Sequence, residues 1–241
     1  MKRLLSWLAI VVAAASPVVA QSQAAFVDAF SGRWQVYEQT YAAGGSMCGF
    51  ELSGLAAGSS RLGLRTSGCA APLNTASGWS IEGSQLVLYD GQDKELARLG
   101  GNQKRITGTI TGGAPLVLER AGGDGSAAAL QGAFNASGCY FLGYSKDCAP
   151  RSQLSTPQPT PDGRLQIMMQ ANLNAYLEPR PDPANAIGEV QQGTCVVVDA
   201  CIMASDGPWC RAQFGQQVGW LRKFTLRQNR WPVVTFTNSC Q

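Results

Sequence analysis

The chain has 241 residues, of which 19 are basic and 16 are acidic; it contains eight cysteines and no histidine. Without histidine, neither a Ser-His-Asp nor a Cys-His catalytic arrangement can form. The nearly balanced charge also lacks the concentrated positive charge that nucleic acid requires. Composition therefore predicts a protein that is not an enzyme, binds no nucleic acid and uses no cofactor. A glycosidase with paired carboxylates and lysine-based chemistry remain open as enzymatic alternatives.

Residues 1–20 have the pattern of a signal peptide. Lys2 and Arg3 precede an apolar stretch over 4–15, and small residues over 18–20 offer a cleavage site before Gln21. The alternative is a membrane anchor, but the stretch is shorter than the roughly 20 residues that span a bilayer. We therefore expect a periplasmic or secreted protein with no membrane span after signal removal.

The cysteine count is even, and the chain is expected to be exported, which favours a disulfide framework with no metal. A zinc site among the last four cysteines is the alternative, although they lack paired CxxC spacing. The eight cysteines are Cys48, Cys69, Cys139, Cys148, Cys195, Cys201, Cys210 and Cys240.

Between residues 33 and 120 the sequence divides into eight short runs, several of which alternate apolar and polar residues. Leu62 with Leu64, and Leu86 with Leu88, illustrate the period of two that is typical of strands. Gly-rich turns separate the runs, so the pattern predicts an up-and-down barrel or a sandwich. The eight runs are 33–39, 47–52, 61–66, 78–82, 85–90, 95–99, 105–110 and 115–120.

Residues 123–164 read as a Gly/Pro-rich linker that contains a loop closed by cysteines over 139–148. The proline-rich part, 155–161, favours extended backbone. A second compact unit with a C-terminal tail follows over 165–241. Its expected strands are 165–169, 172–177, 195–201, 209–213 and 218–221.

The first unit resembles the AprI/Inh family of metalloprotease inhibitors over residues 21–120. The resemblance is carried by Ser31-Gly-Arg-Trp34, Cys48, Cys69, Gly78-Trp79 and the ladder over 83–120. It implies an all-β fold in which residues 21–122 form an eight-stranded up-and-down β-barrel. It also implies a disulfide between Cys48 and Cys69.

The same resemblance implies a function and a site. In this family, a short N-terminal tail enters the cleft of a secreted zinc metalloprotease of the serralysin type, so the implied partner is such a protease. The matching tail here is Gln21, Ser22, Gln23, Ala24 and Ala25, followed by a short helix or plug over 26–30. A free amine or a carbonyl can occupy the open position of a catalytic zinc, but cyclisation of Gln21 would remove the amine. Alternatives are a merely disordered terminus and broad inhibition of serine or cysteine proteases through a rim loop.

Trp34 and Trp79 have two interpretations. Large aromatic side chains usually supply buried area, which favours a role in the core. A small barrel can also hold one ligand, and the two tryptophans would then line that pocket.

The second unit resembles a bacterial SH3-like domain over about 165–225. The resemblance rests on Trp209 and on Val218-Gly-Trp-Leu221, whereas the segment 174–179 lacks the Arg and Gly of the family pattern. It implies a small SH3-like β-barrel that localises the chain by binding peptidoglycan or a peptide. Tyr176, Trp209 and Trp220 are the candidate groove aromatics. The alternative function is therefore a cell-envelope binding protein without inhibitory activity.

The disulfides of the second unit stay open at this point, because four cysteines allow three pairings. Cys201 and Cys210 straddle the expected turn at Asp206-Gly207 and are plausible cross-strand partners. Cys195 would then pair with Cys240 and hold the tail.

Overall fold

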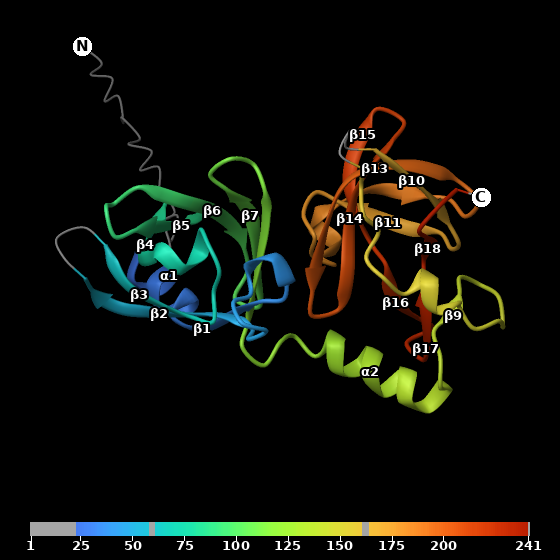
Figure 1. Cartoon of the computed structure of the whole chain (residues 1–241), viewed down its shortest axis with the longest axis horizontal. Coiled ribbons are helices and arrows are strands. Elements are labelled where there is room, and N and C mark those ends of the chain that lie inside the picture. The colour runs from blue at the N-terminus through green and yellow to red at the C-terminus, as the bar shows by residue number, and fades with distance from the viewer. Residues whose placement is uncertain (1–22, 58–60, 161–163, 241) are drawn as a thin grey trace, which may run out of the picture.

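The computed structural model describes residues 23–57, 61–160 and 164–240. The expected signal peptide and the first two residues of the expected tail, Gln21 and Ser22, lie outside the described residues. The described chain forms two β units that lie side by side (Figure 1). Two α-helices, α1 (Gln23–Phe30) and α2 (Ser126–Ser137), accompany the strands.

The first unit is a closed barrel in which each strand pairs with its neighbour and β1 pairs with β8. All of these pairings are antiparallel, which confirms the predicted eight-stranded barrel. Three strands begin and end where the alternation of the sequence places them, namely β5, β7 and β8. The strands are β1 (Gly32–Val36), β2 (Cys48–Ala56), β3 (Leu62–Ser67), β4 (Ala76–Glu82), β5 (Gln85–Asp90), β6 (Glu95–Gly101), β7 (Arg105–Ile110) and β8 (Pro115–Arg120).

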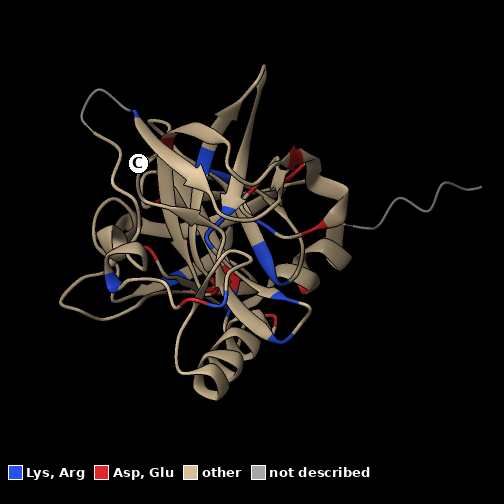
Figure 2. Cartoon of the chain, turned by 90° about the vertical axis from the view of Figure 1, so that its right-hand side faces the viewer, with Lys and Arg blue, Asp and Glu red and all other residues tan. Residues whose placement is uncertain are grey.

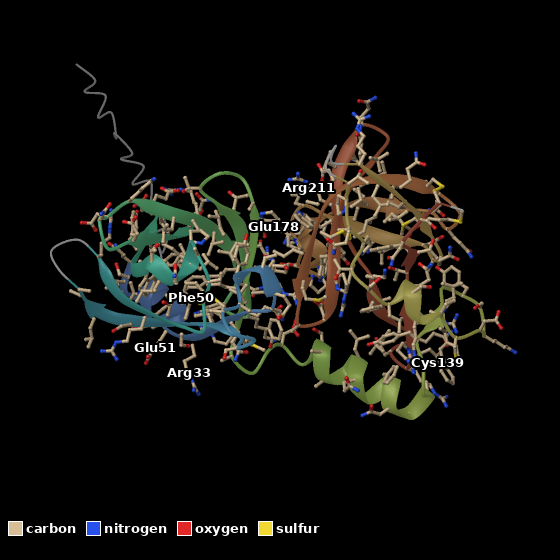
Figure 3. The ribbon with its side chains drawn as sticks, viewed as in Figure 1. Arg33, Phe50, Glu51, Cys139, Glu178 and Arg211 are labelled. Atoms are coloured by element: carbon tan, nitrogen blue, oxygen red, sulfur yellow. A yellow bond between two sulfur atoms is a disulfide. The ribbon has the colours of Figure 1, made fainter. Side chains whose placement is uncertain are left out.

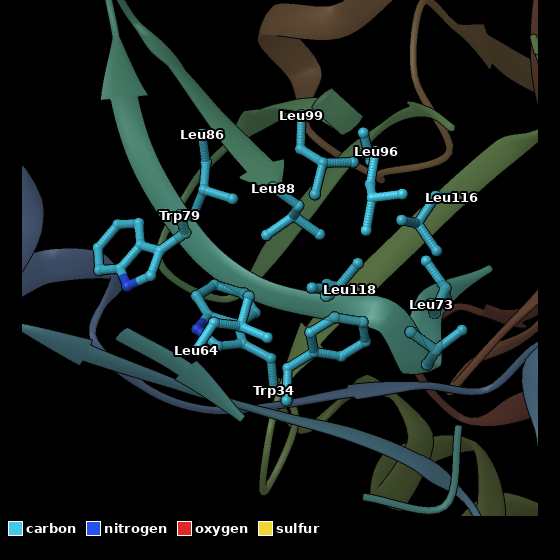
Figure 4. Close-up of a cluster of buried hydrophobic side chains, with 14 of the residues drawn as sticks. Trp34, Leu64, Leu73, Trp79, Leu86, Leu88, Leu96, Leu99, Leu116 and Leu118 are labelled. Atoms are coloured by element: carbon cyan, nitrogen blue, oxygen red, sulfur yellow. The ribbon is translucent and has the colours of Figure 1, made fainter. Parts of the chain in front are cut away.

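The barrel interior is filled by side chains from alternate positions of these strands, as closure of a small barrel requires. Leucines from β3, β5, β6 and β8 meet Trp34 and Trp79 in one cluster (Figure 4). Both tryptophans are buried, and their indole N–H groups donate to the backbone carbonyls of Phe30 and Ser53 at 2.8 and 3.0 Å. The two tryptophans are therefore part of the packed core.

The second unit contains two sheets. The larger has seven strands in the order β12-β11-β15-β14-β13-β10-β18, and the smaller has the order β16-β17-β9. The strands are β9 (Phe141–Leu142), β10 (Leu165–Met169), β11 (Leu173–Tyr176), β12 (Ala186–Val190), β13 (Cys195–Ala204), β14 (Gly207–Phe214), β15 (Gln217–Arg222), β16 (Phe224–Arg227), β17 (Trp231–Val234) and β18 (Phe236–Thr237). Four short 3-10 helices complete the described secondary structure: η1 (Gln39–Tyr41), η2 (Leu73–Thr75), η3 (Arg151–Gln153) and η4 (Pro183–Asn185).

The segment that was expected to be a linker packs onto the second unit. Helix α2 runs along strands β16 and β17 of the small sheet (Figure 1), and β9 pairs in parallel with β17. Pro157, in the proline-rich part, is buried. Lys223 Nζ donates to the carbonyl of Ser155 at 2.8 Å and to the side chain of Asn238. The proline-rich part is thus held by hydrogen bonds to the second unit.

All eight cysteines form disulfides. The pairs are Cys48–Cys69, Cys139–Cys148, Cys195–Cys240 and Cys201–Cys210. The four cysteines considered as zinc ligands are therefore paired with one another. Cys201 faces Cys210 directly across the β13–β14 ladder, because the hairpin turn at Ser205-Asp206, one residue before the expected position, sets that register.

Candidate functional site

Helix α1 lies at one end of the barrel, which we call the helix end. Strand β1 begins here, directly after α1, and β8 ends here, because Trp34 of β1 pairs with Arg120 of β8. The turn between β6 and β7 lies at the same end, and Gly101 enters that turn with φ 145°. A Cβ atom on Gly101 would lie 2.4 Å from the carbonyl oxygen of Arg105, so only glycine allows this approach of the two strands.

Arg120 fixes the C-terminus of α1. Its two terminal nitrogens donate to the carbonyls of Ser31 and Ala29, and its Nε donates to the carbonyl of Gln103 at 3.1 Å. The guanidinium carbon also lies 4.3 Å from the centroid of the Trp34 ring. A cation at the carbonyl end of a helix complements the helix dipole, while burial lowers the pKa of Arg120. Through this side chain, α1 and the β6–β7 turn are held as one rigid edge.

The last three residues of the expected tail form the first turn of α1. Gln23, Ala24 and Ala25 are exposed. The helix thus begins at Gln23, three residues before the expected start at Phe26. Gln23–Ala25 thus have helical rather than extended backbone.

Grooves lie on both sides of α1. One, of about 500 Å³, is lined by Ala25, Phe26, Ala29 and Phe30 of the helix and by the β6–β7 turn over 102–104. The other, of about 520 Å³, lies between α1 and the ends of β2, β3 and β4. The helix is therefore a ridge across the barrel end, with a hollow along each flank.

The outer wall formed by β7 and β8 is covered by the second unit. Arg105, Thr107, Val117 and Glu119 lie at alternate positions from those that fill the barrel interior. Such positions face away from the interior of a barrel, yet none of these four residues is more than 2% exposed. Strand β13 of the second unit contacts β8, and Figure 1 shows the second unit on the side of the barrel where β7 lies.

A network of buried charges crosses this contact. Arg105 Nη2 lies 2.9 Å from Asp206 Oδ1 and 3.2 Å from Glu119 Oε2, and Asp206 Oδ2 lies 2.9 Å from Arg222 Nε. Glu119 also accepts from the backbone N–H of Ser205 at 2.7 Å. Burial lowers the pKa of Arg105, but the carboxylates of Asp206 and Glu119 outweigh that effect and raise it. We call these five residues the buried charge network.

The three candidate groove aromatics of the second unit lie at the same contact. Trp209 and Trp220 belong to a cluster with Val117 of the barrel, and Tyr176 packs against it. Trp209 is fully buried, and its indole N–H donates to Asp206 Oδ1 at 2.9 Å. While the two units stay together, the surfaces of Trp209 and Trp220 are thus largely taken up by contacts within the chain.

Charged residues elsewhere are interspersed, and Figure 2 shows Lys and Arg on the same faces as Asp and Glu. Within residues 23–57, 61–160 and 164–240, no group of three or more His, Cys, Asp or Glu side chains is placed to hold a metal ion. Within the same ranges, no helix combines the length and apolar character needed to cross a membrane.

A comparison with known protein families finds a match over the residues that form the barrel. Residues 26–120, which run from α1 to the end of β8, match the family described as protease inhibitor Inh. No curated protein matches the chain. The matched range ends where the second unit's segments begin. The four disulfides together with this match fit an extracytoplasmic protein. The barrel with its helix α1 is thus similar to the family of protease inhibitors described as Inh.

Proposed function

We propose that this chain is an exported, non-enzymatic inhibitor of a secreted zinc metalloprotease of the serralysin type. The family match of residues 26–120 supports the inhibitor function. The residues before Phe26 then enter the protease cleft, while the helix end of the barrel docks against its edges. Export follows from the signal pattern over 1–20 and suits the disulfides.

The observation that carries this proposal is the fixed position of α1. Three donors of Arg120 hold the C-terminus of the helix against the barrel, and the exposed Gln23–Ala25 project from it as the first turn. A segment whose base is already ordered loses less entropy on binding than a free peptide does. Small side chains such as Ala24 and Ala25 also suit a narrow cleft.

A panel of purified secreted proteases tests the proposal, with serralysin-type zinc enzymes beside serine and cysteine proteases. We expect inhibition of the zinc enzymes at micromolar concentration or below. The mature chain with residues 21–25 deleted is expected to lose it. A matched control replaces the same five residues by Gly and Ser at constant length, which separates the reach of the segment from its side chains. Unchanged inhibition by the deletion variant would refute entry of the tail.

The second unit is proposed to be an SH3-like module, and its proposed role is localisation of the inhibitor. Because Trp209 and Trp220 are buried at the barrel, any peptidoglycan or peptide must bind elsewhere on this unit or displace the barrel. Cosedimentation of the mature chain with peptidoglycan tests this. Sedimentation combined with no inhibition of any zinc protease would favour a cell-envelope binding protein instead.

A further inference from the structure

We propose that the second unit contributes directly to the protease-docking surface, through the loop 177–182 and above all through Leu177. This inference rests on the proposed function, and it names the part of the chain outside the matched family range that the protease contacts.

The loop lies beside the helix end of the barrel. The carbonyl of Pro179 accepts from Arg105 Nη1 at 3.0 Å, and Arg105 is the first residue of β7, next to the β6–β7 turn. A Cβ atom added to Gly100 would lie 3.9 Å from Glu178 Oε1. Figure 3 shows Glu178 on the side of the second unit that faces the barrel. The loop 177–182 therefore lies near the β6–β7 turn, and residues 102–104 of that turn also line the groove along α1.

The loop is ordered by its own contacts. Arg180 Nη2 lies 3.0 Å from Glu178 Oε2, and Arg180 Nη1 lies 3.3 Å from Asp182 Oδ2. Backbone hydrogen bonds from Leu177 to Asn185 and from Asp182 to Arg180 close the loop at both ends. Pro179 and Pro181 restrict the backbone further. Such a loop presents its side chains without a large loss of entropy on binding.

Leu177 is nevertheless 62% exposed. It is one of five large apolar side chains that are exposed in the described part of the chain, and Leu55, at 79%, is another. Leu55 is near the end of β2, so it lies at the helix end, where it lines a separate hollow between β2 and β3. Met47, by contrast, precedes β2 at the opposite end of the barrel. Each unit thus contributes one exposed leucine near the helix end, Leu55 from the barrel and Leu177 from the loop beside the β6–β7 turn.

The occupant must be a protein that also receives the N-terminal segment, which is the protease. The wall of β7 and β8 is excluded as a docking face because the second unit covers it. A protease that takes in the residues before Phe26 approaches the helix end, and the loop 177–182 lies near that end, beside the β6–β7 turn.

The test measures inhibition constants of the full mature chain against the zinc protease that the panel identifies. We expect Leu177→Asp to weaken inhibition at least tenfold, because an apolar contact is replaced by a charge that must be desolvated. Met47→Asp is the matched control, since Met47 is 46% exposed but lies at the other end of the barrel, and its inhibition constant should be unchanged. Thermal unfolding of both variants checks that the fold is kept. Leu177→Ala removes the apolar contact without adding a charge, so we expect its inhibition to be weakened less than that of Leu177→Asp.

Hydrogen exchange gives a second readout without substitutions. Amides of residues 177–182 should exchange more slowly when the protease is bound, as should those of α1. If Leu177→Asp inhibits as well as the natural chain while deletion of residues 21–25 abolishes inhibition, the inference is wrong and the proposed function stands. If the natural chain inhibits no zinc protease, the proposed function fails and the inference falls with it.

Discussion

The wall of β7 and β8 and the helix end of the same barrel differ in what covers them. At the wall, Arg105, Val117 and Glu119 are buried against the second unit. At the helix end, the first turn of α1 is exposed and two grooves flank the helix. Both regions belong to the same antiparallel barrel. The difference shows that the second unit determines which face of the barrel remains open to a partner.

The largest loss of stability is expected from a substitution at the covered wall of β7 and β8. Asp206→Ala removes the carboxylate that lies within 2.9 Å of both Arg105 and Arg222, and leaves two buried cations without it. We expect the free energy of unfolding to fall by about 3–5 kcal/mol. Chemical denaturation of the purified mature chain measures this loss. If the variant unfolds with an unchanged midpoint, the buried charge network does not hold the two units together.

The next largest loss of stability is expected from a substitution at the helix end. Arg120→Ala removes the donors to Ala29, Ser31 and Gln103, and hydrogen bonds from a charged group are worth about 1.5–3 kcal/mol. We expect a loss of about 2 kcal/mol and faster hydrogen exchange in α1. Arg65→Ala, at an exposed arginine of β3, is the control and should leave both quantities unchanged. Arg120→Lys should rescue only part of the loss, because an ammonium lacks the planar fork.

The strands of the barrel were predictable because the positions that fill its interior recur at every second residue, as in Leu62 with Leu64 and Leu86 with Leu88. The covered wall was not predicted, since Arg105 and Glu119 occupy positions that would face solvent in an isolated barrel. The run Leu116-Val117-Leu118 carried the missing signal. Three consecutive apolar residues in a strand indicate that both of its faces are buried.

Helix α2 was missed for a different reason. The glycines near residue 125 contributed to the prediction of a linker over 123–164, but Gly125 and Gly138 flank a segment with three consecutive alanines and Leu130. Gly138 adopts φ 76° and its N–H donates to the carbonyl of Phe134, which ends the helix. The glycines thus mark helix ends. A short helix or plug over 26–30 was expected, whereas the start of α1 at Gln23 and the contact of its end with Arg120 were not.

A third prediction concerns Lys223, which holds the proline-rich part on the side of the second unit. Burial lowers the pKa of Lys223 to about 8, below its value in the unfolded chain. Below pH 8 both states are protonated, and the cost of burying the charge is present in full. As pH rises above 8 the folded chain loses this proton before the unfolded chain does, so stability should rise by about 1–2 kcal/mol towards pH 9.5. Denaturation across this range measures it, with Lys223→Met as reference; an equal pH dependence in both would contradict the assignment.

The smallest effect is expected on the second unit's exposed surface, and it sharpens the comparison with Asp206. Asp199 and Arg211 form an ion pair of 2.8 Å, but their side chains are 48% and 40% exposed. Exposed pairs contribute about 0–1 kcal/mol because water and salt screen them. Asp199→Ala should therefore change the free energy of unfolding by less than about 1 kcal/mol, and less still at high salt. Both aspartates lie in or beside the β13–β14 hairpin and face an arginine, so burial is the main variable that differs between them. A loss at Asp199 as large as that at Asp206 would show that the hairpin itself, rather than its contact with the barrel, is what the buried charges stabilise.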